Sequence, residues 1–317
     1  VTLLIIPVFN VDGHERKSPF NRINQNGPTE MGWRTTAQNY NLNRDYMKAD
    51  SPEMQSWLKL FNSWLPDFFV DSHTTDGADY QYNITYGIEK FKNLPTKTAK
   101  FVKEKFIPFN NKRTEEKGFL IAPYVAFKGR NVESGIVDYT ASPRFSTGYT
   151  AIQNRIGLLI ETHMLKPYKD RVFSTKAMFE NVIEFCNQNK DELLNINKEG
   201  DEFVIQNYFK NKNSYPLSFD VSDKSKPFLY KGIEAIEEDS WITGKKVLRY
   251  TGKPFEKEIP FFDDNIVRDS IDIPTSYIIP IENKYLVERI KVHGINVDVL
   301  KKDKKFIVEK YKLKNVR

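Results

Sequence analysis

Cysteine is almost absent from this sequence, because Cys186 is the single residue of this type among 317. One cysteine cannot form a disulfide framework within the chain. The stretch 179–186 has helical spacing, so we expect Cys186 to be a core residue. Hydrophobic residues make up 39 % of the chain, with 23 Phe and 16 Tyr, and a sizeable core can therefore form.

Long hydrophobic runs are also lacking. The mostly apolar run 1–8 is too short to span a bilayer and reads instead as a buried strand. An initiator Met, a charged segment before an apolar stretch, and a small-residue cleavage site are all missing from the start. We therefore expect the chain to begin inside a longer protein, with any targeting signal upstream.

The excess of positive charge is small and local. The net charge is +6, from 48 basic and 42 acidic residues, and the segment 301–317 alone holds eight Lys or Arg against two acidic residues. Such a segment is typical of a solvated face or of an edge strand protected by lysines. A nucleic-acid surface needs basic and aromatic residues spread over one face, and this pattern is missing. We expect no nucleic-acid partner and no membrane span.

The clearest element is a helix that begins after Ser51. Ser51 can cap it, Pro52 suits its first position, and Pro66 ends it. Its apolar residues recur at helical spacing on one face: Met54, Trp57, Leu58 and Phe61. An apolar strand at 67–72 follows, so the order of strand, helix and strand predicts a parallel crossover.

Further elements complete the predicted architecture. We expect helices at 95–107, 170–197 and 282–293 and strands at 119–125, 157–160, 203–208, 217–221, 246–250 and 277–281, with a terminal hairpin at 297–300 and 306–313. The segment 197–201 resembles a boundary. Residues 1–198 are therefore predicted to form an α/β domain with a mixed, largely parallel sheet flanked by helices, and residues 199–317 a smaller, strand-rich domain.

Two residues stand where such a sheet places its chemistry. His73 follows the strand that ends at Ser72, and Glu161 follows the strand that ends at Ile160. In open α/β sheets, sites form outside the carboxyl ends of the strands. Each residue also has an ordinary explanation, because a histidine at a strand end can be a hydrogen-bonded structural residue and a glutamate can mark where a strand meets water.

The long loop before the first helix carries further polar residues. Trp33-Arg34 and Asn41-Leu42-Asn43-Arg44 lie in it. An arginine fork binds a carboxylate through two hydrogen bonds, and a neighbouring asparagine adds another. Taken alone, these residues are typical of any polar surface.

Six fragments occur in the order found in one known family: Ile-Pro-Val-Phe-Asn-Val-Asp-Gly at 6–13, Trp33-Arg34, Asn41–Arg44, Asp71-Ser-His73, Tyr139-Thr-Ala-Ser142 and Leu159-Ile-Glu161. Residues 1–165 therefore resemble the zinc carboxypeptidase family, and 145–161 look closest to its bacterial members. The resemblance implies a zinc-peptidase-like fold. Because such bacterial relatives are often exported, it also implies a secreted or periplasmic protein.

The resemblance assigns roles in catalysis. His73 resembles the third zinc ligand of the family, and Glu161 resembles the general base that takes a proton from zinc-bound water. Zinc lowers the pKa of that water toward ~7, so a nearby carboxylate can complete its activation. Arg34 resembles the arginine that stabilises the developing oxyanion.

The resemblance also assigns substrate-binding residues. Asn43 and Arg44 resemble the pair that grips the terminal carboxylate of a peptide, so the implied substrate is a peptide with a free C-terminus. Tyr139, which lies 22 residues before Glu161, resembles the mobile tyrosine that closes over the substrate. Tyr149 on the same loop is a competing candidate.

The family takes two further zinc ligands from a His-x-x-Glu motif, and none of the four histidines here begins one: His14, His73, His163 and His293. A catalytic zinc needs three protein ligands, so His73 alone should not hold the metal. Asp76 or Asp79 could orient a ligand imidazole, and His163 is expected to be structural. We expect this chain by itself to be metal-poor and inactive, and the longer protein to bind zinc.

Three functions are consistent with these residues. The first is a zinc-dependent peptidase that removes C-terminal residues by metal-activated water, with Glu161 as general base. The second is an amidohydrolase of the same family that acts on a cell-wall peptide or an acyl-amino acid. The third is a non-catalytic module that binds peptide or glycan. Zinc content would separate the third from the first two.

Overall fold

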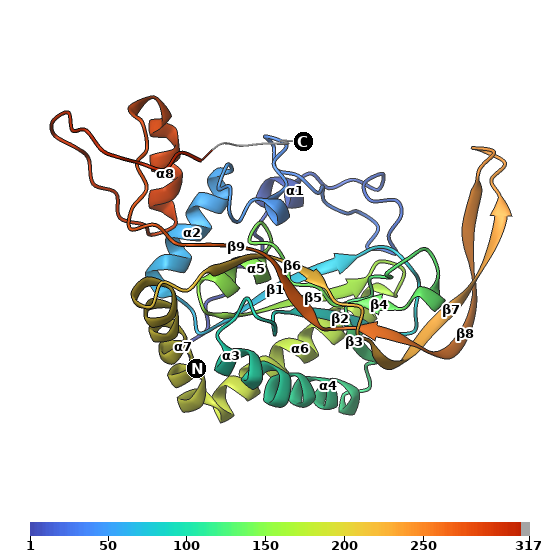
Figure 1. Cartoon of the computed structure of the whole chain (residues 1–317). Coiled ribbons are helices and arrows are strands. Elements are labelled where there is room, and N and C mark those ends of the chain that lie inside the picture. Colours follow the sequence, from blue (N-terminus) through green and yellow to red (C-terminus); the bar gives the residue numbers. More distant parts are fainter. Residues whose placement is uncertain (312–317) are drawn as a thin grey trace.

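The computed structural model describes residues 1–311 and has a central four-stranded sheet (Figure 1). Its strands are β1 (Phe68–Thr75), β2 (Ile84–Ile88), β3 (Ile121–Pro123) and β5 (Ile156–His163), in the order β1-β5-β2-β3. The pairs β1–β5 and β2–β3 are parallel, and β5–β2 is antiparallel. The expected α/β class with a mixed sheet is confirmed.

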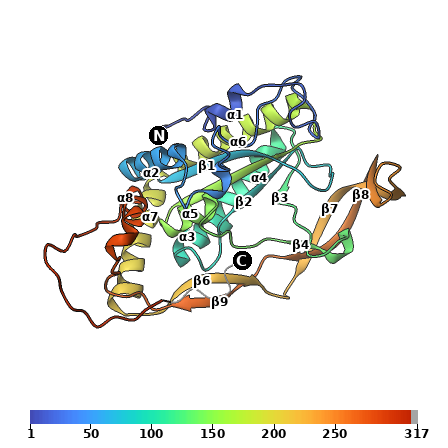
Figure 2. The ribbon, with the colours of Figure 1, turned by 90° about the horizontal axis from the view of Figure 1, so that it is seen from above.

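Helices cover both faces of this sheet (Figures 1 and 2). The helices are α1 (Val11–Glu15), α2 (Pro52–Trp64), α3 (Thr96–Phe101), α4 (Ile107–Glu116), α5 (Ser146–Ile152), α6 (Tyr168–Gln188), α7 (Lys190–Val204) and α8 (Lys284–Val292). The 3₁₀ turns are η1 (Leu42–Arg44), η3 (Val132–Ser134) and η5 (Ile281–Asn283), and the π-helical segments are η2 (Val102–Phe106) and η4 (Ile205–Lys210). One buried cluster joins the sheet to α3, α6 and α7, and another joins it to α2 and α5.

Helix α2 confirms its prediction from local sequence. The Ser51 Oγ accepts a hydrogen bond from the Met54 backbone N–H at 3.1 Å, and Pro52 is the first helical residue. The helix ends at Trp64, and the next residue, Leu65, has a left-handed φ of 44°. The four residues predicted to form its apolar face are all buried: Met54, Trp57, Leu58 and Phe61. Cap and periodicity therefore specify this element without tertiary information.

The alternation of side chains along the strands decides which face carries the polar residues. On β1, Phe68 and Val70 pack in the α3–α6–α7 cluster, and Phe69 packs in the α2–α5 cluster. Successive side chains of a strand point to opposite faces, so Asp71 and His73 share the face of Phe69. The polar end of β1 therefore faces the layer that contains α2 and α5.

The predicted strand at the start of the chain is wrong. Residues 1–8 pair with no strand, and Leu3, Leu4 and Ile5 are each more than half exposed. β1 is the outer strand of the sheet, and no described segment adds to its free edge. An apolar run forms a strand only when a neighbour satisfies its backbone groups. The predicted crossover from this run through α2 to β1 is therefore wrong too.

Several predicted boundaries also change. β1 and β5 run on to Thr75 and His163, so His73 and Glu161 lie inside strands rather than after them. The helix expected at 95–107 continues to Glu116 through η2 and α4, and the strand expected at 119–125 shrinks to β3. The segment 128–150, for which no helix or strand was predicted, contains β4 (Ile136–Val137) and α5.

The boundary predicted at 197–201 lies within α7, and the strand predicted at 203–208 is helical. The strands after this point are β6 (Tyr215–Val221), β7 (Lys226–Asp239), β8 (Lys246–Phe262) and β9 (Asn265–Ile271). They confirm the strands expected at 217–221 and 246–250, whereas 277–281 is not a strand. Figure 1 shows β7 and β8 projecting from the body as a long two-stranded arm.

The strand-rich part packs on the central sheet. Tyr82 from the first half shares a buried cluster with Tyr230 and Phe261 from β7 and β8. Helix α8 lies against α2, because the Asn62 side chain donates to the Val292 carbonyl at 2.7 Å. α8 stops before Gly294, whose φ is +78°. The predicted terminal hairpin is not formed as far as residue 311, and residues 312–317 of the basic segment lie outside the described residues.

The sheet core gives a first prediction. Leu158 is fully buried on β5, and Leu158→Ala should lower the free energy of unfolding by about 2–5 kcal/mol because it leaves a cavity. Leu194→Ala is the matched control, since Leu194 is 54 % exposed on α7 and its loss should cost less than ~1 kcal/mol. Urea denaturation measures both changes. Equal losses in the two variants would contradict the assignment of Leu158 to the core.

Candidate functional site

A buried acid orients His73. The His73 Nε2 lies 2.9 Å from the Asp71 Oδ2, two residues back on the same face of β1. The Tyr46 hydroxyl donates a second hydrogen bond to the same oxygen at 3.3 Å. Both side chains of the His73–Asp71 pair are less than one quarter exposed, at 23 % and 18 %. The imidazole is therefore held in one orientation by a carboxylate that is itself anchored.

The charges of this pair stabilise one another. Burial alone lowers the pKa of His73, but the Asp71 carboxylate and, to a lesser degree, the Glu161 carboxylate raise it to about 9. Burial raises the pKa of Asp71, but His73 and hydrogen bonds from Ser146 and Tyr46 bring it below its usual value. At neutral pH this chain therefore holds an imidazolium–carboxylate ion pair.

Glu161 lies directly beside His73, because the two residues are register partners in the parallel pair β1–β5. Its backbone carbonyl accepts a hydrogen bond from the Thr85 hydroxyl at 3.2 Å, which ties it to β2. Its side chain is only 8 % exposed, and Oε2 has no hydrogen-bond partner among the described residues. Burial raises the pKa of Glu161 to about 7. A carboxyl in this state can accept or donate a proton near neutral pH.

A cavity of about 130 Å³ lies next to Glu161. Four of the six residues predicted for the site line it: Asn43, Arg44, Tyr139 and Glu161. They come from η1, from the loop after β4 and from β5, which are far apart in the sequence. The structure therefore brings the predicted base and the predicted carboxylate grip to one small cavity, whereas His73 and Arg34 do not line it.

Arg44 has no acidic partner at the cavity in the part of the chain that the structure describes. Its Nη1 donates to the Asn43 carbonyl at 2.7 Å, and its guanidinium carbon lies 4.5 Å from the centre of the Phe145 ring. Burial lowers the pKa of Arg44, and the charges of Arg34 and Arg144 lower it further. A cation in this setting is stabilised by an incoming anion.

The loop that carries Asn43 and Arg44 is anchored at its next residue. The buried Asp45 carboxylate accepts hydrogen bonds from the Ser51 hydroxyl at 2.7 Å, the Ser51 N–H at 2.8 Å and the Asp50 N–H at 3.0 Å. Asp45 thus closes the loop onto the residue that caps α2. The position of the predicted grip therefore depends on the start of this helix.

Arg34 is exposed and lies outside the cavity lining. Its backbone carbonyl accepts a hydrogen bond from the Asn10 side chain at 3.1 Å. Its positive charge nevertheless lowers the pKa of both His73 and Glu161. The guanidinium is thus near enough to act on the site electrostatically without contacting it.

The two tyrosines proposed as the mobile group occupy different places. Tyr139 lines the cavity and is 49 % exposed, so it has room to move. Tyr149 is fully buried in the α2–α5 cluster, and its hydroxyl lies 3.0 Å from the His293 Nδ1. The geometry favours Tyr139 over Tyr149 as the group that contacts a ligand.

Two further cavity residues were missed in the sequence. Tyr124 lies just past β3, and its hydroxyl is 3.1 Å from the Thr75 hydroxyl. Glu89 lies just past β2, a strand that was not predicted. The strand expected at 119–125 placed Tyr124 inside an element instead of at its end. Because β2 runs antiparallel to β5, the carboxyl ends of β2 and β3 lie at the opposite edge of the sheet from those of β1 and β5. The strand-end rule applied to β1 and β5 therefore gives no signal for Tyr124 or Glu89.

Glu89 holds the loop that carries Tyr139. Its carboxylate accepts hydrogen bonds from the Asn93 side chain at 2.7 Å, the Ala141 N–H at 3.0 Å and the Thr147 hydroxyl at 3.3 Å. Burial raises the pKa of Glu89 to about 7. The neighbouring acid of the cavity, Asp138, forms an ion pair with Lys90.

Among residues 1–311, the other acids and histidines near the site form no hydrogen bond or ion pair with His73. Asp79, proposed as a residue that could orient the imidazole, contacts Lys166 at 3.3 Å and lies 3.9 Å from His163 instead. Asp76 is exposed and makes no hydrogen bond to His73, so Asp71 is the orienting acid. His163 is fully buried, and its Nδ1 accepts a hydrogen bond from the Leu165 N–H at 3.2 Å, as its expected structural role requires.

The residues present do not form a zinc site. No group of three or more His, Cys, Asp or Glu side chains within residues 1–311 is arranged to hold a metal ion. The Nε2 of His73 already contacts Asp71, and the raised pKa of the imidazole means that a metal would have to displace its proton. The contact between the His73 imidazole and the Asp71 carboxylate is typical of metal-bound histidines. The three-ligand group that a zinc site needs is not formed among the described residues.

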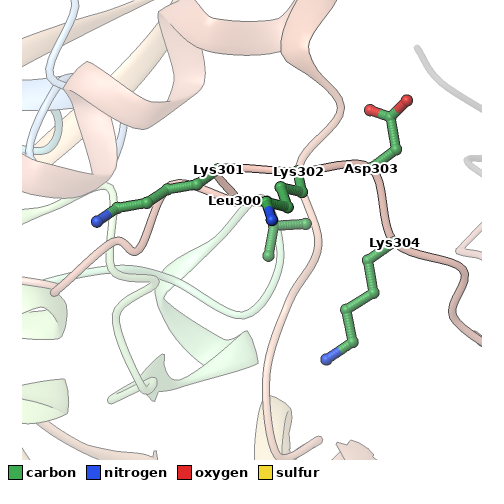
Figure 3. A pocket seen from close by; sticks show the side chains of 5 residues that line it. All are labelled: Leu300, Lys301, Lys302, Asp303 and Lys304. Carbon is green, nitrogen blue, oxygen red and sulfur yellow. The ribbon is translucent and has the colours of Figure 1, made fainter.

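A second hollow, of about 420 Å³, lies against Leu300–Lys304 (Figure 3). Its five lining residues are consecutive and exposed, and no second element contributes to it. Figure 3 shows the side chains of Lys301 and Lys304 pointing in different directions. A binding site needs polar groups that converge on one point, so we assign no function to this hollow.

Comparison with protein-family models, curated proteins and solved structures gives no match to this chain. The resemblance to zinc carboxypeptidases therefore rests on the sequence fragments alone. Among residues 1–311, no helix combines the length and the apolar character needed to cross a bilayer.

The unpaired carboxyl of Glu161 gives a prediction about pH and stability. Its pKa is about 7 in the folded chain against 4.5 ordinarily. A raised folded pKa contributes stability below pH 4.5 that is lost as the pH rises through 7. Glu161→Gln removes this titration. Between about pH 5 and about pH 8, the free energy of unfolding of the variant should therefore rise relative to that of the native chain by up to about 3 kcal/mol.

Urea denaturation at both pH values measures this gain. The exposed Glu258→Gln is the matched control and should show no pH-dependent difference. A constant difference between Glu161→Gln and the native chain at the two pH values would mean that the pKa of Glu161 is not raised.

Proposed function

We propose that this protein is a peptidase that removes residues from the C-terminus of peptides. The observation that carries the proposal is the convergence on one cavity of a buried carboxyl with a free oxygen, Glu161, and an arginine without an acidic partner, Arg44. An exopeptidase of this kind needs a general base at the scissile bond and a cation at the terminal carboxylate.

In the proposed reaction, the residues at and near the cavity have separate roles in substrate binding or catalysis. Arg44 and Asn43 bind the terminal carboxylate, which places the last peptide bond near Glu161. Glu161 takes a proton from the attacking water and returns it to the leaving amine. Tyr139, half exposed at the cavity mouth, closes over the bound residue. Arg34 adds positive charge where the oxyanion develops.

Zinc dependence is proposed from the family resemblance alone. The family resemblance implies a metal that activates the water, with His73 as one ligand. The described residues contain no group of three or more His, Cys, Asp or Glu arranged to hold a metal, so no catalytic step of this chain is assigned to one. What the structure supports at this point is the orientation of His73 by Asp71.

A second candidate function is a non-catalytic module that binds peptides by their C-terminus. The lack of a three-ligand group within residues 1–311 favours it. It would use Asn43, Arg44 and Tyr139 in the same way and would need no role for Glu161. An amidohydrolase that acts on a cell-wall peptide or an acyl-amino acid also requires a free carboxylate, and substrate tests separate it from a peptidase.

The main experiment uses the natural full-length protein. It should release C-terminal residues from peptides, and Glu161→Gln should lower kcat by roughly 10²–10⁴ because the general base is lost. Mass spectrometry of the products and metal analysis are the measurements. Glu258→Gln is the control and should keep full activity.

Each outcome separates the candidates. Full activity in Glu161→Gln would disprove the role of Glu161. A full-length protein that binds peptides but contains no zinc and releases no residues would support the binding module instead.

The chain of residues 1–317 gives a separate prediction. Because no group of three or more His, Cys, Asp or Glu among residues 1–311 is arranged to hold a metal, we expect the purified chain to retain far less than one zinc per molecule after dialysis. Elemental analysis checks this result. Stoichiometric zinc that is lost in His73→Ala would show that the ligand set is complete after all.

A further inference from the structure

Two arginines share one aromatic ring at the wall of the cavity. The guanidinium carbon of Arg44 lies 4.5 Å from the centre of the Phe145 ring, and that of Arg144 lies 5.9 Å from it. Phe145 and Arg44 line the cavity, and Arg144 is exposed beside them. Neither guanidinium forms an ion pair with an acid among residues 1–311. Both guanidinium groups therefore lie against one ring without an ion-pair partner in the described part of the chain.

The surroundings do not neutralise this pair. Arg34 and Arg144 both act on Arg44 as repelling charges, and Arg22 is repelled by Arg34 in turn. Lys48 nearby is paired with Asp50 at 2.5 Å. Arg34 and Arg144 thus both lie within electrostatic reach of Arg44, and none of these three arginines forms an ion pair among the described residues.

The acids of the cavity are already engaged. Asp138 is paired with Lys90, and the carboxylate of Glu89 accepts hydrogen bonds from Asn93, Ala141 and Thr147. Glu161 is the general base in the proposed function and forms no ion pair with either arginine. None of the three is an ion-pair partner of Arg44 or Arg144.

We propose that Arg144 binds a second carboxylate, so that the site selects peptides that end in an acidic residue. The proposal rests on the proposed function, in which Arg44 binds the terminal carboxylate. A C-terminal glutamate or aspartate carries both carboxylates on one short aliphatic spacer. Its α-carboxylate meets Arg44, its side-chain carboxylate meets Arg144, and the spacer lies against Phe145.

The chemistry disfavours the other side-chain classes. A C-terminal lysine or arginine would add a cation to an uncompensated pair of cations. A neutral side chain would leave Arg144 without an anion. An arginine binds a carboxylate through charge-assisted hydrogen bonds, which are stronger than neutral ones. The unpaired guanidinium of Arg144 therefore favours a peptide that ends in an acidic residue over one that ends in the neutral isostere.

Equilibrium binding to the chain of residues 1–317 tests the proposal without turnover. Fluorescent peptides that differ only in a final Glu, Gln or Lys are titrated at low salt. The Glu peptide should bind roughly tenfold more tightly than the Gln peptide, and the Lys peptide more weakly than either. Arg144→Gln should weaken binding of the Glu peptide far more than of the Gln peptide.

The control variant is Arg130→Gln, which changes an exposed arginine outside the cavity lining and should leave the preference intact. Equal affinities for the Glu and Gln peptides would overturn the proposal, and so would an equal loss for both peptides in Arg144→Gln. The same peptides with an amidated C-terminus test the proposed function separately. Amidation removes the terminal carboxylate that Arg44 is proposed to bind. Unchanged binding after amidation would therefore contradict that contact, independently of any preference between the Glu and Gln peptides.

Discussion

The parallel pairing of β1 with β5 is the constraint on which the rest of the site depends. Its register sets His73 beside Glu161 and directs both toward the layer of α2 and α5. A slip of one residue would turn a whole row of side chains to the other face of the sheet. The packing of Ile156, Leu158 and Ile160 in the opposite cluster prevents such a slip, since each of them is fully buried.

The same pairing requires a close approach of α5. A Cβ added at Gly157 would lie 2.1 Å from the Thr150 hydroxyl, so only glycine lets this helix settle on β5. The seated helix brings Phe145 to the cavity, and Glu89 fastens the preceding loop through the Ala141 N–H. The position of the cavity wall thus depends on the sheet register, on Gly157 and on the buried Glu89.

The site concentrates charges that the protein does not neutralise. Glu161 and Glu89 are buried, with pKa values raised to about 7, and Arg44 has no acid beside it. Such groups lower stability and are typical of functional sites, where a bound ligand or a proton neutralises the charge that the fold leaves unpaired. The pair Asp71–His73 differs, because its two charges stabilise each other. The charged groups of the site are therefore of two kinds: the Asp71–His73 pair lies outside the cavity lining, and Glu161 and Arg44, which form no ion pair among residues 1–311, lie within it.

The sequence by itself determined α2, the α/β class and four of the residues that line the cavity, Asn43, Arg44, Tyr139 and Glu161. Local signals were sufficient there, because a cap and a helical period do not depend on distant neighbours. Only the tertiary structure decided that Tyr139 and not Tyr149 faces the cavity and that Asp71 orients His73. It also left the apolar run at 1–8 unpaired. These outcomes depend on which face, edge or partner strand a residue meets, and the order of residues along a chain does not contain that information.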